Sequence, residues 1–112
     1  MEIVKAMETE VAENPHGVDV RQLHSTSHVQ VVMITLAAGE TLKPHITPVD
    51  AFFYGLEGEG KVQIGEDVAT LGTDGLVHSP AGIVHRLWNE QDRAFRFLVV
   101  KTPRQTNPSR LL

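Results

Sequence analysis

Residues 39–60 read GETLKPHITPVDAFFYGLEGEG, and this stretch decides the fold. It opens with a Gly-Glu turn, continues through Pro44, and places His45 shortly before an apolar run from Ala51 to Leu56. A Gly-Glu-Gly sequence closes the stretch. Glycine and proline bend the backbone, and the residue before a proline is pushed into an extended conformation. The stretch therefore predicts a strand bounded by turns, with a rigidly presented histidine before its entrance.

A second stretch, residues 80–89, reads PAGIVHRLWN and repeats this arrangement. Its Pro/Gly turn delivers His85 to the start of a further strand. Other short runs are rich in β-branched and aromatic residues, which predicts strands over residues 18–23, 29–37, 61–64, 68–71, 76–79 and 95–100. No segment shows a sustained helical stripe. Many short strands separated by Gly/Pro turns indicate an all-β sandwich or barrel.

Length and composition indicate one domain without covalent cross-links. A chain of 112 residues buries roughly 65% of its unfolded surface, which is enough for a single core. We expect one domain over residues 1–112, with a core from about residue 18 to 102 and a flexible tail over residues 103–112. The chain has no cysteine, so disulfides and thiolate metal ligands are excluded.

Charge and hydropathy exclude two classes of partner. The net charge is −4 and the basic residues are scattered, whereas nucleic-acid binding needs a clustered basic surface. No apolar run approaches the length of a membrane span, and the charged first residues do not resemble a secretory signal. We therefore expect a soluble, cytoplasmic protein with neither nucleic-acid nor membrane partners.

Residues 39–60 resemble the first motif of the cupins, G-x5-H-x-H-x3-E-x6-G. Gly39, His45 and Gly58 occupy its first, second and last positions. Thr47 stands at the second histidine of that motif, and Ala51 stands at its glutamate. Two of the four usual cupin metal ligands are therefore missing from this chain.

The second stretch resembles the second cupin motif, G-x5-P-x-G-x2-H-x3-N. Its spacing is matched by Pro80, Gly82, His85 and Asn89, while Asp74 takes the leading glycine position. The resemblance spans about residues 29–101. It implies a small single-domain cupin, an all-β double-stranded β-helix (jelly-roll) barrel.

The resemblance also implies a divalent transition metal, such as Zn, Fe, Mn, Ni or Cu. His45 and His85 are its expected ligands, and neutral imidazole binds all these metals. Metal sites usually need three or more protein ligands. His78 and Asp50 are tentative further candidates, although Asp50 precedes the vacant glutamate position and strand neighbours point to opposite faces.

A second interpretation is a metal-free pocket in which the two imidazoles form hydrogen bonds. Thr47 and Ala51 leave space where ligand side chains would stand, and Phe53 and Leu87 complete the expected lining. The sequence leaves three functions open. The protein is a small-molecule-binding cupin, a metal-dependent dioxygenase, isomerase or lyase of a small organic substrate, or a structural cupin without a site.

The sequence further predicts a homodimer. In cupins an N-terminal strand often joins the sheet of a neighbouring subunit, and residues 2–12 fit either a strand or a short helix. We expect a strand there. Phe52, Phe53 and Tyr54 offer more apolar surface than one small barrel readily covers, and large apolar patches mark interfaces.

Overall fold

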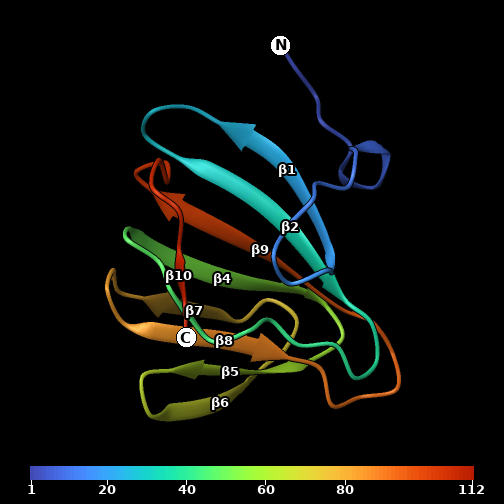
Figure 1. Cartoon of the computed structure of the whole chain (residues 1–112). Helices are drawn as coiled ribbons and strands as arrows, with labels where there is room; N and C mark the ends of the chain where they lie inside the picture. The colour runs from blue at the N-terminus through green and yellow to red at the C-terminus, as the bar shows by residue number, and fades with distance from the viewer.

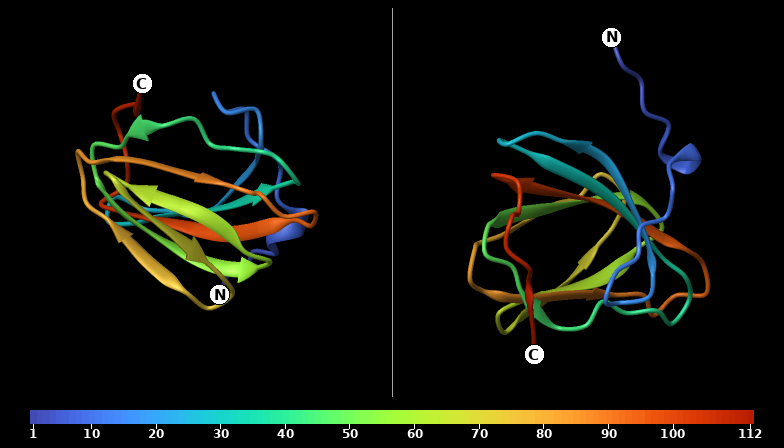
Figure 2. Two further views of the ribbon diagram at one scale, coloured as in Figure 1. Left: turned by 90° about the horizontal axis from the view of Figure 1, so that it is seen from below. Right: turned by 45° about the horizontal axis from the view of Figure 1, so that its top comes forward.

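Two antiparallel five-stranded sheets make up the fold (Figure 1). The structure, a computed structural model, describes residues 1–112. The first sheet has the strand order β1 (Asp19–Ser25), β2 (Gln30–Leu36), β9 (Phe95–Thr102), β4 (Asp50–Glu57) and β7 (Leu76–Ser79). The second has the order β10 (Arg110–Leu111), β3 (His45–Ile46), β8 (Val84–Trp88), β5 (Gly60–Ile64) and β6 (Asp67–Leu71). In Figure 2 the two sheets form the walls of one barrel.

The core lies between the two sheets because inward side chains alternate with outward ones along each strand. On β9, for example, Phe95, Phe97 and Val99 are buried, whereas Arg96 and Leu98 are only half-buried. The buried apolar cluster draws on both sheets and comprises Val18, Val32, Ile34, Leu36, Leu42, Ala51, Phe53, Val62, Leu71, Leu87, Phe95, Phe97 and Val99. This arrangement confirms the predicted all-β jelly-roll barrel.

Two motif residues hold the turns of the barrel together. Gly58 has a φ of 68°, and a Cβ atom there would overlap the Ala94 carbonyl oxygen, so only glycine fits. Asn89 is 2% exposed and donates through Nδ2 to the carbonyls of Leu36 and Arg93, at 3.0 and 2.7 Å. These two positions of the sequence motifs therefore serve the fold rather than the site.

The N-terminal segment differs from its predicted conformation. The expected strand over residues 2–12 is wrong, because the segment contains only a single 3-10 turn, η1 (Ala6–Glu8). A strand needs a backbone partner, and within this chain the segment makes one backbone hydrogen bond to β1, from the Ala12 amide to the Val20 carbonyl. Its other bonds to β1 come from the Arg21 side chain, which donates to the carbonyls of Met7 and Thr9. The chain has no helix that is long and apolar enough to cross a membrane.

The C-terminal segment lies against the barrel. Residues 103–112, expected from the sequence to form a flexible tail, run from the end of β9 across the barrel to the second sheet (Figures 1 and 2). There β10 pairs with β3, with Leu111 opposite His45. The backbone pairing between β10 and β3 holds the segment in place. Pro103, Asn107 and Pro108 are turn residues, and they do not predict a strand there.

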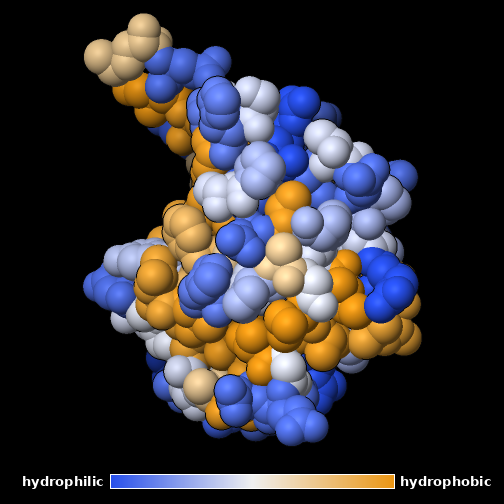
Figure 3. Space-filling model, turned by 90° about the vertical axis from the view of Figure 1, so that its left-hand side faces the viewer, coloured by the Kyte–Doolittle hydropathy of each residue, from blue (hydrophilic) through white to orange (hydrophobic).

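Apolar side chains also remain on the outside of the barrel. Figure 3 shows a broad apolar area on one face of the molecule. Leu76 on β7 and Val68 on β6 are among the exposed large apolar residues, with 61% and 55% of their surfaces accessible. Exposed apolar surface of this kind is typical of an interface.

Candidate functional site

A cavity of about 410 Å³ opens between the two sheets and is lined by twenty residues. Its apolar wall comes mainly from the first sheet and includes Val20, Val32, Ile34, Phe53 and Val99. Its polar wall includes His16, His45, Thr47, His85, Lys101, Gln105 and Ser109, and Asn14, Gln22 and Gln30 add further polar groups to the lining. Small-molecule sites usually have roughly 300–1,000 Å³ and combine an apolar lining with a few polar groups. The cavity has both properties.

The two motif histidines lie side by side in this cavity. His45 on β3 pairs directly with His85 on β8, so both rings project from the same sheet toward the barrel interior. Their ring centroids are 4.5 Å apart in an edge-on arrangement, and their Nε2 atoms are 3.0 Å apart. The sequence prediction that these two histidines converge agrees with this geometry.

The partners of the rings determine which nitrogen carries each proton. The Nδ1 atom of His45 lies 2.7 Å from the Lys43 carbonyl oxygen, which can only accept, so Nδ1–H is the donor. The Nε2 atom of neutral His45 is then an acceptor, and Nε2–H of His85 donates to it. The remaining Nδ1 of His85 accepts from the Ser79 hydroxyl at 2.7 Å. This assignment gives every ring nitrogen of the pair a suitable partner.

The surroundings keep both rings neutral. Burial, followed by the nearby His45, lowers the pKa of His85 from 6.5 to about 3. Burial also lowers the pKa of His45, although its hydrogen bond to Lys43 partly opposes this. The positive charge of Lys101 lowers both pKa values further. At neutral pH the pair therefore offers hydrogen-bond donors and acceptors without charge.

A third histidine, His16, reaches the cavity from the N-terminal segment. The side chain of Asn14 shapes the local turn by accepting from the His16 amide at 3.1 Å and donating to the Val18 carbonyl at 2.8 Å. His16 Nδ1 accepts from the Lys43 amide at 2.9 Å, so the neutral ring carries its proton on Nε2. Burial, followed by the nearby His45, lowers the pKa of His16 to about 4.

A chain of hydrogen bonds crosses the polar wall from the C-terminal segment to the histidines. Lys101 Nζ donates to Gln105 Oε1 at 2.7 Å, and Gln105 Nε2 donates to Ser109 Oγ at 2.9 Å. Ser109 Oγ lies 3.2 Å from Thr47 Oγ1, which lies 3.0 Å from His85 Nε2. The C-terminal segment is therefore part of the site.

The structure separates the other predicted site residues into two groups. Thr47 and Phe53 line the cavity, and the Phe53 and His85 rings are 5.4 Å apart. Ala51 and Leu87, predicted to line it as well, are buried in the apolar core and do not border the cavity. Both predicted positions face inward, but neighbouring side chains cover them.

His78 and Asp50, the two tentative metal ligands, lie outside the cavity. His78 is exposed and pairs with Phe52, while the inward positions beside it are held by Ser79 and Ala51. Asp50 is also exposed, and its carboxylate accepts from the Ala81 amide at 2.8 Å. Strand alternation thus directs His78 away from the histidine pair, and Asp50 fastens the Pro/Gly turn.

The donor groups in the cavity do not fit a resident divalent metal ion. No group of three or more His, Cys, Asp or Glu side chains is arranged to hold one. His45 and His85 supply two nitrogens, which are hydrogen-bonded to each other, and the Thr47 hydroxyl beside His85 is neutral. The third histidine, His16, has its ring 5.0 Å from that of His45 and uses Nδ1 to accept from the Lys43 amide. The Lys101 ammonium on the same wall would also repel a cation.

Ser79 and His85 form a hydroxyl–imidazole contact, but it is not placed as a nucleophile and base. Ser79 is 1% exposed and does not line the cavity, so a bound molecule would not reach its oxygen. The hydroxyl instead donates to Nδ1 of His85 and so holds the ring in place, while the tautomer is set through His45 and the Lys43 carbonyl.

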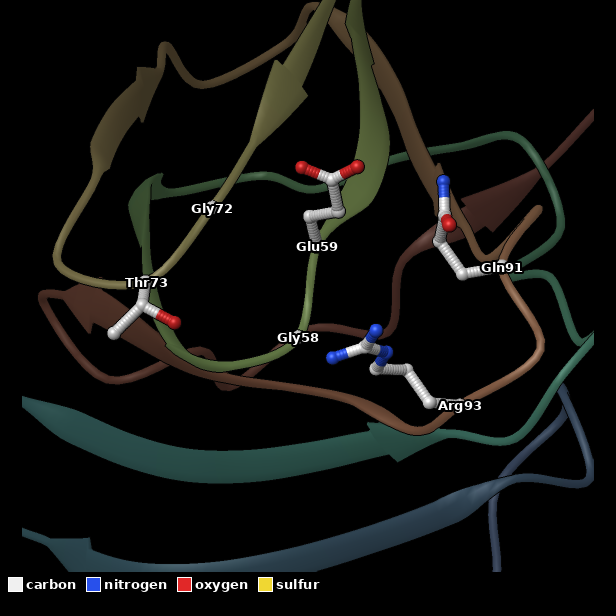
Figure 4. A pocket seen from close by; sticks show the side chains of 6 residues that line it. All are labelled: Gly58, Glu59, Gly72, Thr73, Gln91 and Arg93. Carbon is white, nitrogen blue, oxygen red and sulfur yellow. The ribbon is translucent and has the colours of Figure 1, made fainter.

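A second hollow, of about 440 Å³, lies beside the turns β4–β5, β6–β7 and β8–β9 (Figure 4). Side chains of Glu59, Thr73, Gln91 and Arg93 surround it, and none of its six lining residues is hydrophobic. A hollow without an apolar wall excludes water poorly. This hollow shares no residue with the histidine cavity. Because the histidine cavity has an apolar wall and this hollow has none, the histidine cavity is the stronger candidate site.

Sequence reasoning missed several cavity residues, namely His16, Lys101, Gln105 and Ser109. Lys101 could have been found, because it continues the inward series of Phe97 and Val99 at a spacing of two residues. The others reach the cavity through segments outside the main strands, and no spacing in the sequence marks them.

Comparison with known proteins agrees with this architecture. The sequence profile of the cupin domain matches residues 32–101. The TT1209 protein of Thermus thermophilus has 30% identity and a TM-score of 0.80, and the alignment covers 93% of this chain and 99% of that one. Among proteins of curated function, none matches the chain.

Two more distant structures share the fold. An uncharacterised double-stranded β-helix protein from Klebsiella pneumoniae has 20% identity and a TM-score of 0.83, over 99% of this chain and 96% of that one. The polyketide cyclase RemF of Streptomyces resistomycificus has 19% identity and a TM-score of 0.85, over 100% of this chain and 85% of that one.

Proposed function

Because the chain belongs to the cupin family, we propose that it binds a small organic molecule in the cavity between its two sheets. The observation that carries this proposal is the division of the cavity into an apolar and a polar wall. The apolar wall would exclude water from the body of the ligand. The polar wall would orient it through groups whose positions are fixed by hydrogen bonds.

His45 and His85 act in this proposal as hydrogen-bonding groups. Both ring nitrogens of His85 have protein partners, which hold its ring in one tautomer and orientation. A ligand that enters beside Thr47 would form hydrogen bonds with the Thr47 hydroxyl and with His85 Nε2–H, which lie 3.0 Å apart. Rigid polar groups lower the entropic cost of binding, since they need no rearrangement.

Binding is better supported than catalysis, the alternative that the sequence left open. A dioxygenase, isomerase or lyase of the metal-dependent kind would need a ligand set that the cavity residues do not provide. His85, with a pKa of about 3, is also a weak base for proton transfer at neutral pH. The proposed role is therefore that of a binding protein.

The experiment measures binding of two small probes, phenylacetamide and phenylacetate, by isothermal titration calorimetry and saturation-transfer NMR. Val99→Phe would place a larger side chain in the cavity and reduce its volume, because Val99 is buried and lines the cavity. We expect at least one probe to bind the parent protein and the variant to bind it at least ~10-fold more weakly.

Val100→Phe is the matched control, since Val100 neighbours Val99 on β9 but does not line the cavity. Circular dichroism would establish that both variants keep the β fold. The proposal is wrong if neither probe binds the parent, or if Val99→Phe and Val100→Phe bind the probe equally well.

A further inference from the structure

Lys101 is a cation in the barrel interior without an anionic partner. It follows the inward-facing Val99 on β9, lies opposite Ala51 on β4, and lines the cavity. Its Nζ atom has one protein partner, the neutral amide oxygen of Gln105 at 2.7 Å. The two ion pairs of the chain, Asp19–Arg21 and Glu57–Arg96, lie elsewhere. Lys101 is half-buried, and a charge that is partly removed from water without a counterion is costly, so its presence calls for an explanation.

The cavity around Lys101 contains no acidic group. None of the twenty lining residues is Asp or Glu, while three are histidines and one is the lysine. Asp50 on β4 pairs with Thr102, the residue after Lys101 on β9. It is exposed, however, and its carboxylate accepts a hydrogen bond from the Ala81 amide. With the histidines neutral, the charged lysine gives the polar wall a positive potential.

The effect of Lys101 reaches the whole polar wall. Its positive charge contributes to the lowered pKa values of His16, His45 and His85. Burial alone lowers the pKa of Lys101 itself, which agrees with the lack of a nearby carboxylate. The three rings and the ammonium group are thus electrostatically coupled, and a negative charge among them would relieve both effects.

We infer that the cavity takes a small organic carboxylate, whose charged group pairs with Lys101 and whose apolar body packs on the wall around Val99. This inference rests on the proposed function, since it names the class of ligand for the same cavity. An anion would supply a counterion for Lys101. The free-energy cost of removing the anion from water would be offset by hydrogen bonds from several donors on one wall.

The hydrogen-bond donors left over on the polar wall suit a carboxylate. Lys101 Nζ uses one of its three N–H groups for Gln105, so two remain. Nε2–H of His16 has no partner in the protein, because the ring accepts through Nδ1. The carboxylate oxygens, which accept only, would therefore meet unpaired donors.

The test compares phenylacetate with phenylacetamide, which have nearly the same shape and differ in charge. Calorimetric titration at neutral pH would be run on the parent, Lys101→Met, Lys101→Arg and Lys61→Met. We expect the parent to prefer phenylacetate by at least ~10-fold, or about 1.4 kcal/mol. Lys101→Met should remove this preference, and Lys101→Arg should retain part of it because the charge remains.

Lys61→Met is the control for lost charge, since Lys61 on β5 bonds to Thr70 on an exposed part of the second sheet. It should leave the preference unchanged. Equal binding of both probes to the parent would overturn the inference while the proposed function stands. Binding of neither probe would remove the proposed function and the inference with it. A preference that survives in Lys101→Met would contradict the role of this lysine.

Discussion

Acid should weaken the fold through His85, and the structure gives the size of this effect. The ring is 4% exposed, and its pKa falls from 6.5 in an open chain to about 3 in the barrel. Well above pH 6.5 the ring is neutral in both states, so it adds no pH dependence. Below that value His85 binds a proton in the unfolded chain but stays neutral in the folded chain, so unfolding becomes more favourable as pH falls.

The magnitude follows from the two pKa values. At pH 5 the unfolded ring is almost fully protonated and the folded ring is not, which costs the folded state about 2 kcal/mol. The loss would approach about 5 kcal/mol only near pH 3, where the folded ring also begins to take up a proton. His45 and His16, whose pKa values are also lowered, should add to the loss in the same direction.

Urea unfolding followed by circular dichroism at pH 7.5 and pH 5 would measure this loss. In His85→Gln the decrease in unfolding free energy between the two pH values should be smaller than in the parent by about 2 kcal/mol. His28→Gln is the control, because His28 is exposed and should leave the decrease unchanged. An identical decrease in the parent and His85→Gln would refute the conclusion that the fold keeps this ring neutral.

Two further predictions concern metal binding and association. The double variant Thr47→His with Ala51→Glu restores the cupin ligand pattern, with the longer Glu side chain reaching inward from β4 on the opposite sheet, so it should bind a divalent transition metal at least ~10-fold more tightly than the parent, in competition with a chromogenic chelator. Adding His85→Ala should abolish the gain, and an unchanged affinity in the double variant would mean that the new side chains do not converge with the histidines. We also predict a homodimer through the outer face of the first sheet, which Leu76→Glu should convert to monomer in sedimentation equilibrium. Val68→Glu on β6, with similar exposure, should not do so, and a monomeric parent would contradict the prediction.

The barrel could be predicted from sequence because its signals are local. The turn residues and β-branched runs around Pro44 and Pro80 mark strand boundaries directly, and the spacing of His45 and His85 places both at strand starts. These features depend on neighbours in the chain, which a sequence displays.

The rest of the site depends on long-range contacts that a sequence does not display. Lys101 and Ser109 meet the histidines only because β9 ends beside the cavity and the C-terminal segment then crosses it. The direction of His78 depended on strand parity, which the turn before it left undetermined. His16 reaches the cavity through a bond to the Lys43 amide across 27 residues, with no matching pattern in the sequence.

The protonation of the histidine pair tests the central claim most directly, namely that His45 and His85 are neutral hydrogen-bonding groups of a ligand pocket. Long-range ¹H–¹⁵N NMR of the parent at neutral pH, before and after one equivalent of Zn²⁺, would report each ring nitrogen. We predict protonated Nδ1 on His45 and protonated Nε2 on His85, with both patterns unchanged by zinc. Loss of the His85 Nε2 proton, together with metal-type shifts at both Nε2 atoms, would contradict the account.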